Sequence, residues 1–119
     1  MPTAREPNIV YEDREGIRVI HIREERLGDS IMPEAFKQAM LASIEGVSMA
    51  AVDLSESAYM ASEQIGKLIS FNRQARDQGT RVVYYDMQPF MRDTFHEMRL
   101  DTVFEIYEDL DEAMAALRR

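Results

Sequence analysis

The sequence has no cysteine, and its five glycines are scattered along the chain. Without cysteine, disulfide bonds, thiolate catalysis and cysteine-based zinc sites are excluded, which suits a reducing cytoplasm. Scattered glycines cannot build a glycine-rich phosphate-binding loop, and no nucleophile elbow or dinucleotide-binding motif is present. We therefore expect no enzyme activity, no catalytic residue and no cofactor.

Long apolar runs are also missing, since none approaches the ~20 residues that a membrane span needs. Residues 1–10 carry Arg5 and Glu6 and have no apolar core, so we expect no signal peptide. With 45% apolar residues in 119, the chain is long enough for one domain with one core. We expect a cytoplasmic protein with a loose leader at 1–8 and a single domain at 9–119.

Positively charged residues are scarce, because 14 lysines and arginines stand against 22 aspartates and glutamates and leave a net charge of −8. Nucleic acids and anionic membranes would be repelled, whereas a protein partner with a basic surface is favoured. The same charge is also what keeps a small domain soluble. Acidic residues dominate the end of the chain, at Asp101, Glu105, Glu108, Asp109, Asp111 and Glu112.

The two histidines, His21 and His96, have no second ligand at a metal-binding spacing such as H-E-x-x-H. We therefore expect no metal site. The nine methionines fit core positions or an adaptable binding surface. We expect Met40, Met49, Met98 and Met114 in the core, and Met60 partly exposed.

Hydrophobic patterning predicts strands that alternate with helices. Strands are expected at 9–11, 17–23, 49–54, 81–85 and 103–107, with a charged turn at 12–16 and a polar loop at 24–30. Helices are expected from Pro33 to Gly46, from Ser62 to Gln78, after Pro89 and after Asp109. The order β-β-α-β-α-β-α-β-α indicates an α/β domain with a mixed sheet and about four helices.

The central stretch, residues 52–78, reads as a buried strand, a polar loop and a long amphipathic helix. Ser62 is expected to cap the helix N-terminus, and Glu63 to lie in the first turn. Asn72 is the one polar residue on the apolar stripe of this helix, and Gly79 ends the helix. From the residues alone, Ser62 is either a plain cap or an exposed hydroxyl that accepts a phosphoryl group.

The run from Asp53 to Leu68, D-L-S-E-S-A-Y-M-A-S-E-Q-I-G-K-L, resembles the STAS domain of bacterial anti-sigma-factor antagonists. The family has D-L-S and then D-S-S-G-L-G at a helix start, and the resemblance places Ser62 at its phosphorylated serine. Ala61, Glu63 and Gln64 depart from the family residues Asp, Ser and Gly. Residues 91–113 match the family's helix, short strand and acid-capped helix, although many members have Gly in place of Arg99.

The resemblance implies a STAS-like fold and a regulatory module of bacterial partner switching. The implied partners are a serine kinase that acts as an anti-sigma factor and a PP2C-type phosphatase. The implied binding surface surrounds the phosphoacceptor Ser62 and comprises Asp29, Ser55, Met60, Ala61, Glu63, Gln64 and Lys67. The three departures favour an alternative, a STAS-like scaffold or small-ligand sensor that is never phosphorylated. The Glu63 carboxylate either interacts with the helix dipole or acts as a permanent mimic of a phosphoryl group. Whether the domain forms a homodimer is left open.

Overall fold

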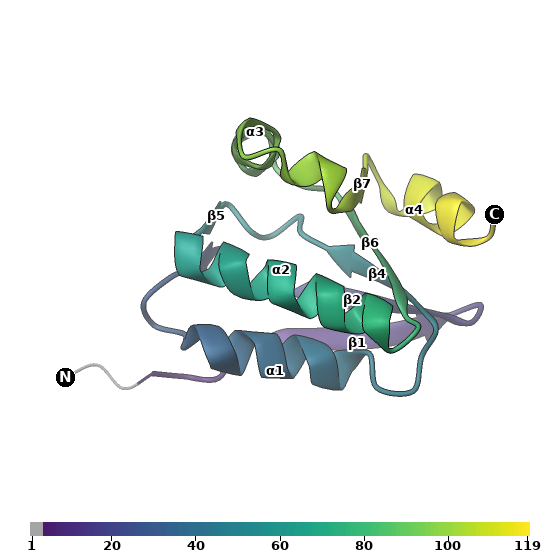
Figure 1. The fold of residues 1–119 in the computed structure, drawn as a ribbon, viewed down its shortest axis with the longest axis horizontal. Helices are drawn as coiled ribbons and strands as arrows, with labels where there is room; N and C mark the ends of the chain where they lie inside the picture. The colour runs from purple at the N-terminus through teal and green to yellow at the C-terminus, as the bar shows by residue number, and fades with distance from the viewer. Residues whose placement is uncertain (1–3) are drawn as a thin grey trace.

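A computed structural model describes residues 4–119. Its main sheet has five strands in the order β1-β2-β4-β6-β7 (Figure 1). β1 runs antiparallel to β2, and the remaining pairs are parallel. The strands are β1 Ile9–Arg14, β2 Ile17–Ile22, β4 Met49–Asp53, β6 Arg81–Tyr85 and β7 Glu105–Tyr107. The expected mixed sheet and element order are therefore confirmed.

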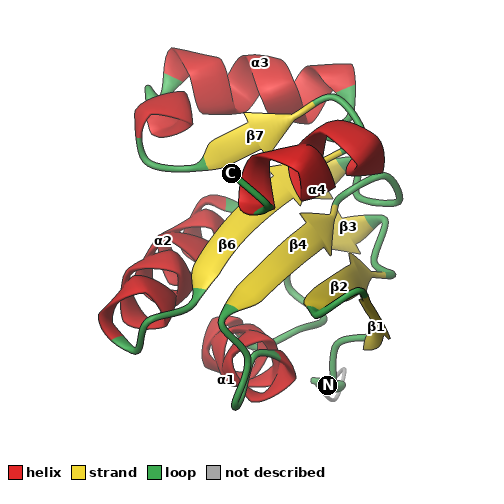
Figure 2. Ribbon diagram, turned by 90° about the vertical axis from the view of Figure 1, so that its right-hand side faces the viewer, coloured by secondary structure: helices red, strands yellow, loops and turns green. Residues whose placement is uncertain are grey.

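Within residues 4–119, four α-helices cover the sheet unequally. They are α1 Pro33–Ser43, α2 Ser62–Asp77, α3 Pro89–Glu97 and α4 Leu110–Leu117. Helices α1 and α2 pack side by side on one face, while α4 lies on the other (Figure 2). Helix α3 lies beside β7 and adds Met91 and Phe95 to the core of the α1–α2 face. This larger core contains Ile20, Val52 and Tyr84, whereas the smaller core under α4 contains Val19, Ala51 and Val83.

A second, two-stranded sheet was not predicted. β3 (Arg26–Leu27) pairs in parallel with β5 (Tyr59–Met60), inside segments expected to be loops. Two residues are too few to show a periodicity, yet Leu27 and Met60 are almost completely buried. This small sheet joins the segment before α1 to the segment before α2.

The first hairpin is longer than expected. β1 continues through Arg14, and the turn is confined to Glu15 and Gly16, which both have positive φ angles. Because β1 is an edge strand, its charged residues remain in solvent while the backbone pairs with β2. The interpretation of residues 12–16 as a charged turn was therefore wrong for most of that segment.

The expected leader is only partly described, because residues 1–3 lie outside the described residues. The segment that follows them is attached to the domain. The backbone N–H of Arg5 donates to the Ser30 carbonyl at 3.0 Å, and Asn8 accepts from the Arg23 N–H at 2.8 Å. No helix within residues 4–119 has the length and apolar character needed to cross a membrane.

Methionine burial differs from the expectation at two positions. Met40 and Met114 are in the core as expected, with Met49 partly buried. Met98 is 49% exposed, because it lies at the C-cap of α3 and outside the helix face that packs on the sheet. Met60 is only 5% exposed, because its strand pairs with β3 and turns its side chain into the larger core.

Candidate partner-binding site

The site begins where β4 ends, at Asp53. Its Oδ1 accepts from the backbone N–H of Ser55 at 2.8 Å, which is the usual local hydrogen bond of an aspartate in a turn. Its Oδ2 pairs with Nδ1 of His21 on β2 at 2.7 Å. Asp53 therefore fixes the direction in which the chain leaves the sheet.

The loop after Asp53 is anchored to the segment before β3. The buried Ser57 hydroxyl donates to the Glu24 carbonyl at 2.9 Å. The backbone N–H groups of Ala58 and Tyr59 both donate to the Glu25 carbonyl, at 2.8 and 3.1 Å. These contacts and the β3–β5 pairing hold the start of α2 beside the segment 28–32.

Helix α2 starts at Ser62, but Ser62 does not cap it. Ala61 occupies the N-cap position with extended backbone angles, and no side chain caps this end. Ser62 is the first helical residue, and its side chain is exposed. The expected N-cap role of Ser62 was therefore wrong, because the helix begins at Ser62 itself, one residue earlier than a Ser62 cap requires. Its hydroxyl donates or accepts no hydrogen bond within residues 4–119.

Ser62 opens onto a hollow of about 470 Å³, called here the Ser62 hollow. One wall comes from Asp29 and Met32 of the segment before α1 and from Pro33, the first residue of α1, and the other wall comes from β5 and the start of α2. Of the expected binding residues, the hollow brings together Asp29, Ala61, Ser62, Glu63 and Gln64. Met32 is 57% exposed and supplies an apolar contact surface that the sequence did not reveal.

Gln64 was expected on the partner surface, but it is only 1% exposed. Its Nε2 donates to the carbonyls of Gly28 and Ile31, at 3.3 and 2.8 Å. Its Oε1 is buried and has no partner among the described residues. Gln64 therefore supports the wall of the hollow from within. Met60 lies in the larger core, so neither side chain can form the outer surface.

Two other expected residues lie outside the hollow. Ser55 is exposed, and its carbonyl accepts from Nε2 of Gln88 at 2.8 Å. Lys67 lies one turn further along α2 and forms an ion pair with Glu34 of α1 at 2.7 Å. The hydrogen bond from Lys67 lowers the pKa of Glu34 to about 2. Lys67 therefore ties α1 to α2, on the same side of the molecule as the hollow.

Sequence reasoning missed Arg26 and Tyr59. They lie opposite each other in the β3–β5 pair, and the Arg26 guanidinium carbon is 4.4 Å from the centroid of the Tyr59 ring. Arg26 lines a smaller hollow of about 310 Å³, called here the Arg26 hollow, which also includes Tyr59, Asp29 and Ala61. The only signal in the sequence was that a polar or aromatic residue is followed by an apolar one in each segment, Arg-Leu and Tyr-Met. Two residues are too few to establish a strand.

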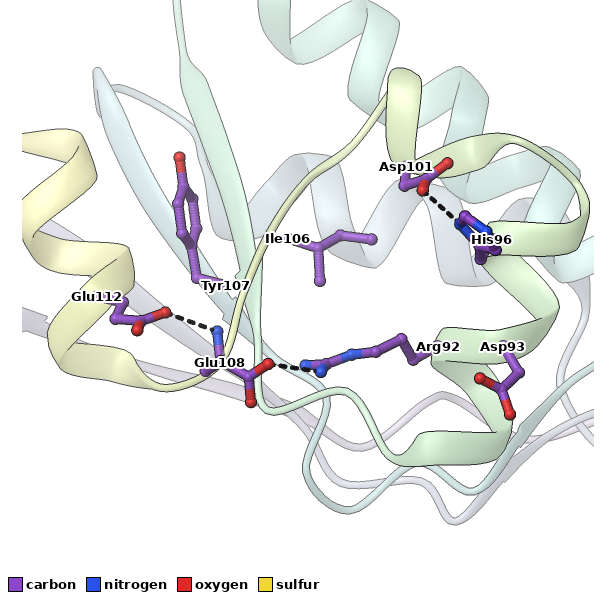
Figure 3. Close-up of a pocket in the computed structure, with 8 residues that line it drawn as sticks. All are labelled: Arg92, Asp93, His96, Asp101, Ile106, Tyr107, Glu108 and Glu112. Atoms are coloured by element: carbon purple, nitrogen blue, oxygen red, sulfur yellow. Dashed lines mark hydrogen bonds and ion pairs between the residues drawn. The ribbon is translucent and has the colours of Figure 1, made fainter.

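A third hollow, of about 410 Å³, lies between α3, β7 and α4 and shares no lining residue with the Ser62 hollow (Figure 3). Four of its charged side chains form two pairs, Arg92 with Glu108 at 2.7 Å and His96 with Asp101 at 2.8 Å. The Asp101 hydrogen bond raises the pKa of His96 above 6.5. Within residues 4–119, no group of three or more His, Asp or Glu side chains is placed to hold a metal ion.

Comparisons with known proteins agree on one fold. A family model described as "Mlab, STAS domain" matches residues 19–108. An anti-sigma factor antagonist from Mycobacterium paratuberculosis is 24% identical, with a TM-score of 0.79 over 98% of this chain and 99% of that chain. No curated protein sequence matches.

Two further solved structures extend the comparison. An anti-sigma-factor antagonist (STAS) domain protein from Planctomyces limnophilus is 20% identical, with a TM-score of 0.77 over 94% of this chain and 98% of that chain. The Bacillus cell fate determinant SpoIIAA in its phosphorylated form is 18% identical, with a TM-score of 0.64 over 92% of this chain and 99% of that chain. At these identities the likeness is one of fold.

Proposed function

The chain belongs to the STAS domain family, and on that basis we propose that it is a regulatory module that binds a protein partner through the Ser62 hollow. The partner is a serine kinase that acts as an anti-sigma factor in a bacterial cytoplasm, and Ser62 is its substrate. The observation that carries the proposal is the position of Ser62, exposed in the first turn of α2 and free of a capping role.

A phosphoryl group suits this position. The first intrahelical hydrogen bond of α2 runs from the Ile65 N–H to the Ala61 carbonyl at 3.0 Å, so the three preceding N–H groups are not used by the helix. Such groups and the helix dipole stabilise an anion at a helix N-terminus. The Ser62 hydroxyl would be reachable by a kinase without any unfolding of the helix.

The switching reaction is a phosphoryl transfer in which this domain is the substrate. The Ser62 Oγ attacks the γ-phosphorus of a nucleoside triphosphate bound by the kinase. A new P–O bond forms, the bond to the diphosphate breaks, and the hydroxyl proton passes to a base of the kinase. A PP2C-type phosphatase reverses the state by hydrolysis and releases inorganic phosphate.

Phosphorylation changes the docking surface by charge. The surface already carries Asp29 and Glu63, and a phosphoryl group adds roughly −1.5 to −2 at pH 7. A partner that packs on Met32 and Tyr59 would then have to bury a dianion beside two carboxylates. The unphosphorylated form therefore binds the kinase, and the phosphorylated form releases it.

A second candidate function is a STAS scaffold or small-ligand sensor that is never phosphorylated. Glu63 favours it, because a carboxylate beside Ser62 repels an incoming phosphate and already supplies a negative charge. Under this alternative the same surface binds partners constantly.

The experiment compares capture of partners from the native cytoplasm by the wild type, Ser62→Asp and Ser62→Ala, with intact mass and site mapping of the recovered protein. Ser70→Asp, in the middle of the same helix and about two turns away from Ser62, is the matched control for added charge. We expect a kinase bound by the wild type, Ser62→Ala and Ser70→Asp, lost from Ser62→Asp, with phosphate on Ser62 of the wild type. The same partners on all four proteins, with no phosphate at position 62, would establish the scaffold instead.

A further inference from the structure

Arg26 is a cation without a carboxylate partner at the edge of the proposed site. Within residues 4–119, no Asp or Glu oxygen lies within 4.0 Å of its nitrogens, whereas its neighbours Arg5 and Arg23 pair with Glu24 and Glu56. Its guanidinium stacks on the Tyr59 ring, with 4.4 Å between the guanidinium carbon and the ring centroid. Stacking of an exposed arginine on an aromatic ring is weak, so the guanidinium can leave the ring for a stronger partner.

The Arg26 hollow and the Ser62 hollow are adjacent. They share Gly28, Asp29, Tyr59 and Ala61 among their lining residues. The backbone holds this arrangement, since the Ala61 N–H donates to the Leu27 carbonyl at 2.8 Å and Ser62 follows directly. Ser62 is three residues beyond Tyr59, a separation of at most ~11 Å along the chain.

The side chains that line the Ser62 hollow cannot supply the positive charge that a phosphoryl group requires, because none of them is a lysine or an arginine. Gln64, in the same wall as Ser62, is 1% exposed, and both of its Nε2 hydrogen bonds go to the carbonyls of Gly28 and Ile31. Its remaining polar atom, Oε1, is an acceptor without a partner among the described residues. Asp29 and Glu63 add negative charge to the hollow. A dianion on Ser62 therefore finds backbone N–H groups at the helix start but needs a cation from the side of Arg26.

We propose that Arg26 reads the phosphorylated state of Ser62: its guanidinium leaves the Tyr59 ring and forms a bidentate ion pair with the phosphoryl oxygens. The planar fork of an arginine fits this geometry, which a lysine cannot reproduce. The movement also uncovers the face of Tyr59 on the docking surface. Phosphorylation thus changes both the charge and the shape that the partner meets. For its physiological setting the inference rests on the proposed function.

The experiment avoids the kinase by incorporating phosphoserine at position 62 during synthesis. Phosphorus NMR then follows the titration of the phosphoserine in the wild type, Arg26→Gln, Arg26→Lys and Arg23→Gln. Arg23→Gln is the matched control, because it removes one charge from the same segment and Arg23 pairs with Glu56 at 3.8 Å. We expect the midpoint in Arg26→Gln to lie about half a pH unit above that of the wild type, with Arg26→Lys between them and Arg23→Gln unchanged.

Proton NMR of the Tyr59 ring is the second measurement. Its signals should differ between the phosphorylated and unphosphorylated wild type, and the difference should vanish in Arg26→Gln. Equal midpoints in the wild type and Arg26→Gln, or an equal shift in Arg23→Gln, would overturn the ion pair. The ion pair would also be overturned if inorganic phosphate, added to the unmodified protein, caused the same changes in the Tyr59 signals, because Arg26 would then be a binding site for free phosphate. If phosphorus NMR showed the difference in midpoint but the capture experiment recovered no kinase, the proposed function would be refuted and the ion pair would still hold.

Discussion

At the scale of single residues, Glu24 connects the N-terminal segment to the site. Its side chain, only 6% exposed, accepts two hydrogen bonds from the Arg5 guanidinium, both 2.6 Å, and one from the Asn8 N–H at 2.7 Å. Its backbone carbonyl accepts from the Ser57 hydroxyl in the site loop. The Arg5 hydrogen bond is the main reason that the pKa of Glu24 lies below its usual 4.5.

Replacing Glu24 with Gln should lower the free energy of unfolding by about 2 kcal/mol at pH 7, because charge-assisted hydrogen bonds to a buried carboxylate are lost. The pKa of Glu24 is lower in the folded state than in the unfolded state, so its contribution is fully present above about pH 4.5. It declines as the pH falls through the folded-state value. Urea unfolding of both proteins from pH 3 to pH 7 should therefore show a difference that narrows below pH 4.5.

Glu56→Gln is the control for this prediction. Glu56 faces solvent and pairs with Arg23 at 3.8 Å, so its loss should change stability by no more than about 0.5 kcal/mol at any pH. If Glu24→Gln behaved like Glu56→Gln, the N-terminal segment would not be anchored through Glu24.

Single residues of the site were only partly predictable. The resemblance to the STAS domain implied that Asp29 lies near Ser62, and both residues line one hollow. It could not show that Gln64 is buried, because a polar residue in a helix start is ordinarily read as exposed. Asn72 seemed off type on an apolar stripe, but its Oδ1 accepts from the buried Tyr84 hydroxyl at 3.0 Å, a contact that depends on the tertiary fold.

At the scale of elements, helices α4 and α2 differ in how their N-termini are capped. Helix α4 is capped by Asp109, whose Oδ1 accepts from the Glu112 N–H at 2.9 Å. Helix α2 has Ala61 at the same position, with φ −66° and ψ 154°, and has no side-chain cap. Helix α2, the longest helix within residues 4–119, therefore begins with three N–H groups that form no hydrogen bond among these residues, at the proposed phosphorylation site.

Ala61→Asp should raise the free energy of unfolding by about 1 kcal/mol, because an aspartate at an N-cap accepts from the N–H of the second or third helical residue. Thermal or urea unfolding measures the change. Ala61→Asn separates capping from charge and should give a similar gain. No gain from either substitution would mean that the first turn of α2 is already satisfied in solution, contrary to the anion-binding role assigned to it.

Elements were predictable where they were long. The repeat of apolar residues located α2, and Pro33 and Asp109 located the starts of α1 and α4. The strands β3 and β5 were not predictable, because each has two residues and forms only where the chain brings them together. At Arg99 the structure explains a family preference that the sequence alone could not explain. The Arg99 φ of 59° lies in the left-handed region, which explains physically why a glycine suits this position in the family.

At the scale of the whole molecule, the two faces of the sheet are stabilised unequally. The larger core joins α1, α2 and α3 to the sheet through residues such as Phe36, Phe71 and Phe95. The smaller core under α4 uses Ala113, Met114 and Leu117, and α4 has only eight residues. Regions with fewer buried apolar side chains open at a lower free energy than the global unfolding of a domain.

Helix α4 should therefore open before the rest of the domain unfolds. Native-state hydrogen exchange should give amide opening free energies in α4 at least about 1 kcal/mol below those in α2. Met114→Ala should lower protection in α4 and leave α2 nearly unchanged. Met40→Ala, a matched truncation in the larger core, should lower protection in both helices by about 2–5 kcal/mol. If Met114→Ala lowered protection in α2 as strongly as in α4, the two faces would unfold as one unit, and α4 could not move independently of the surface at Ser62.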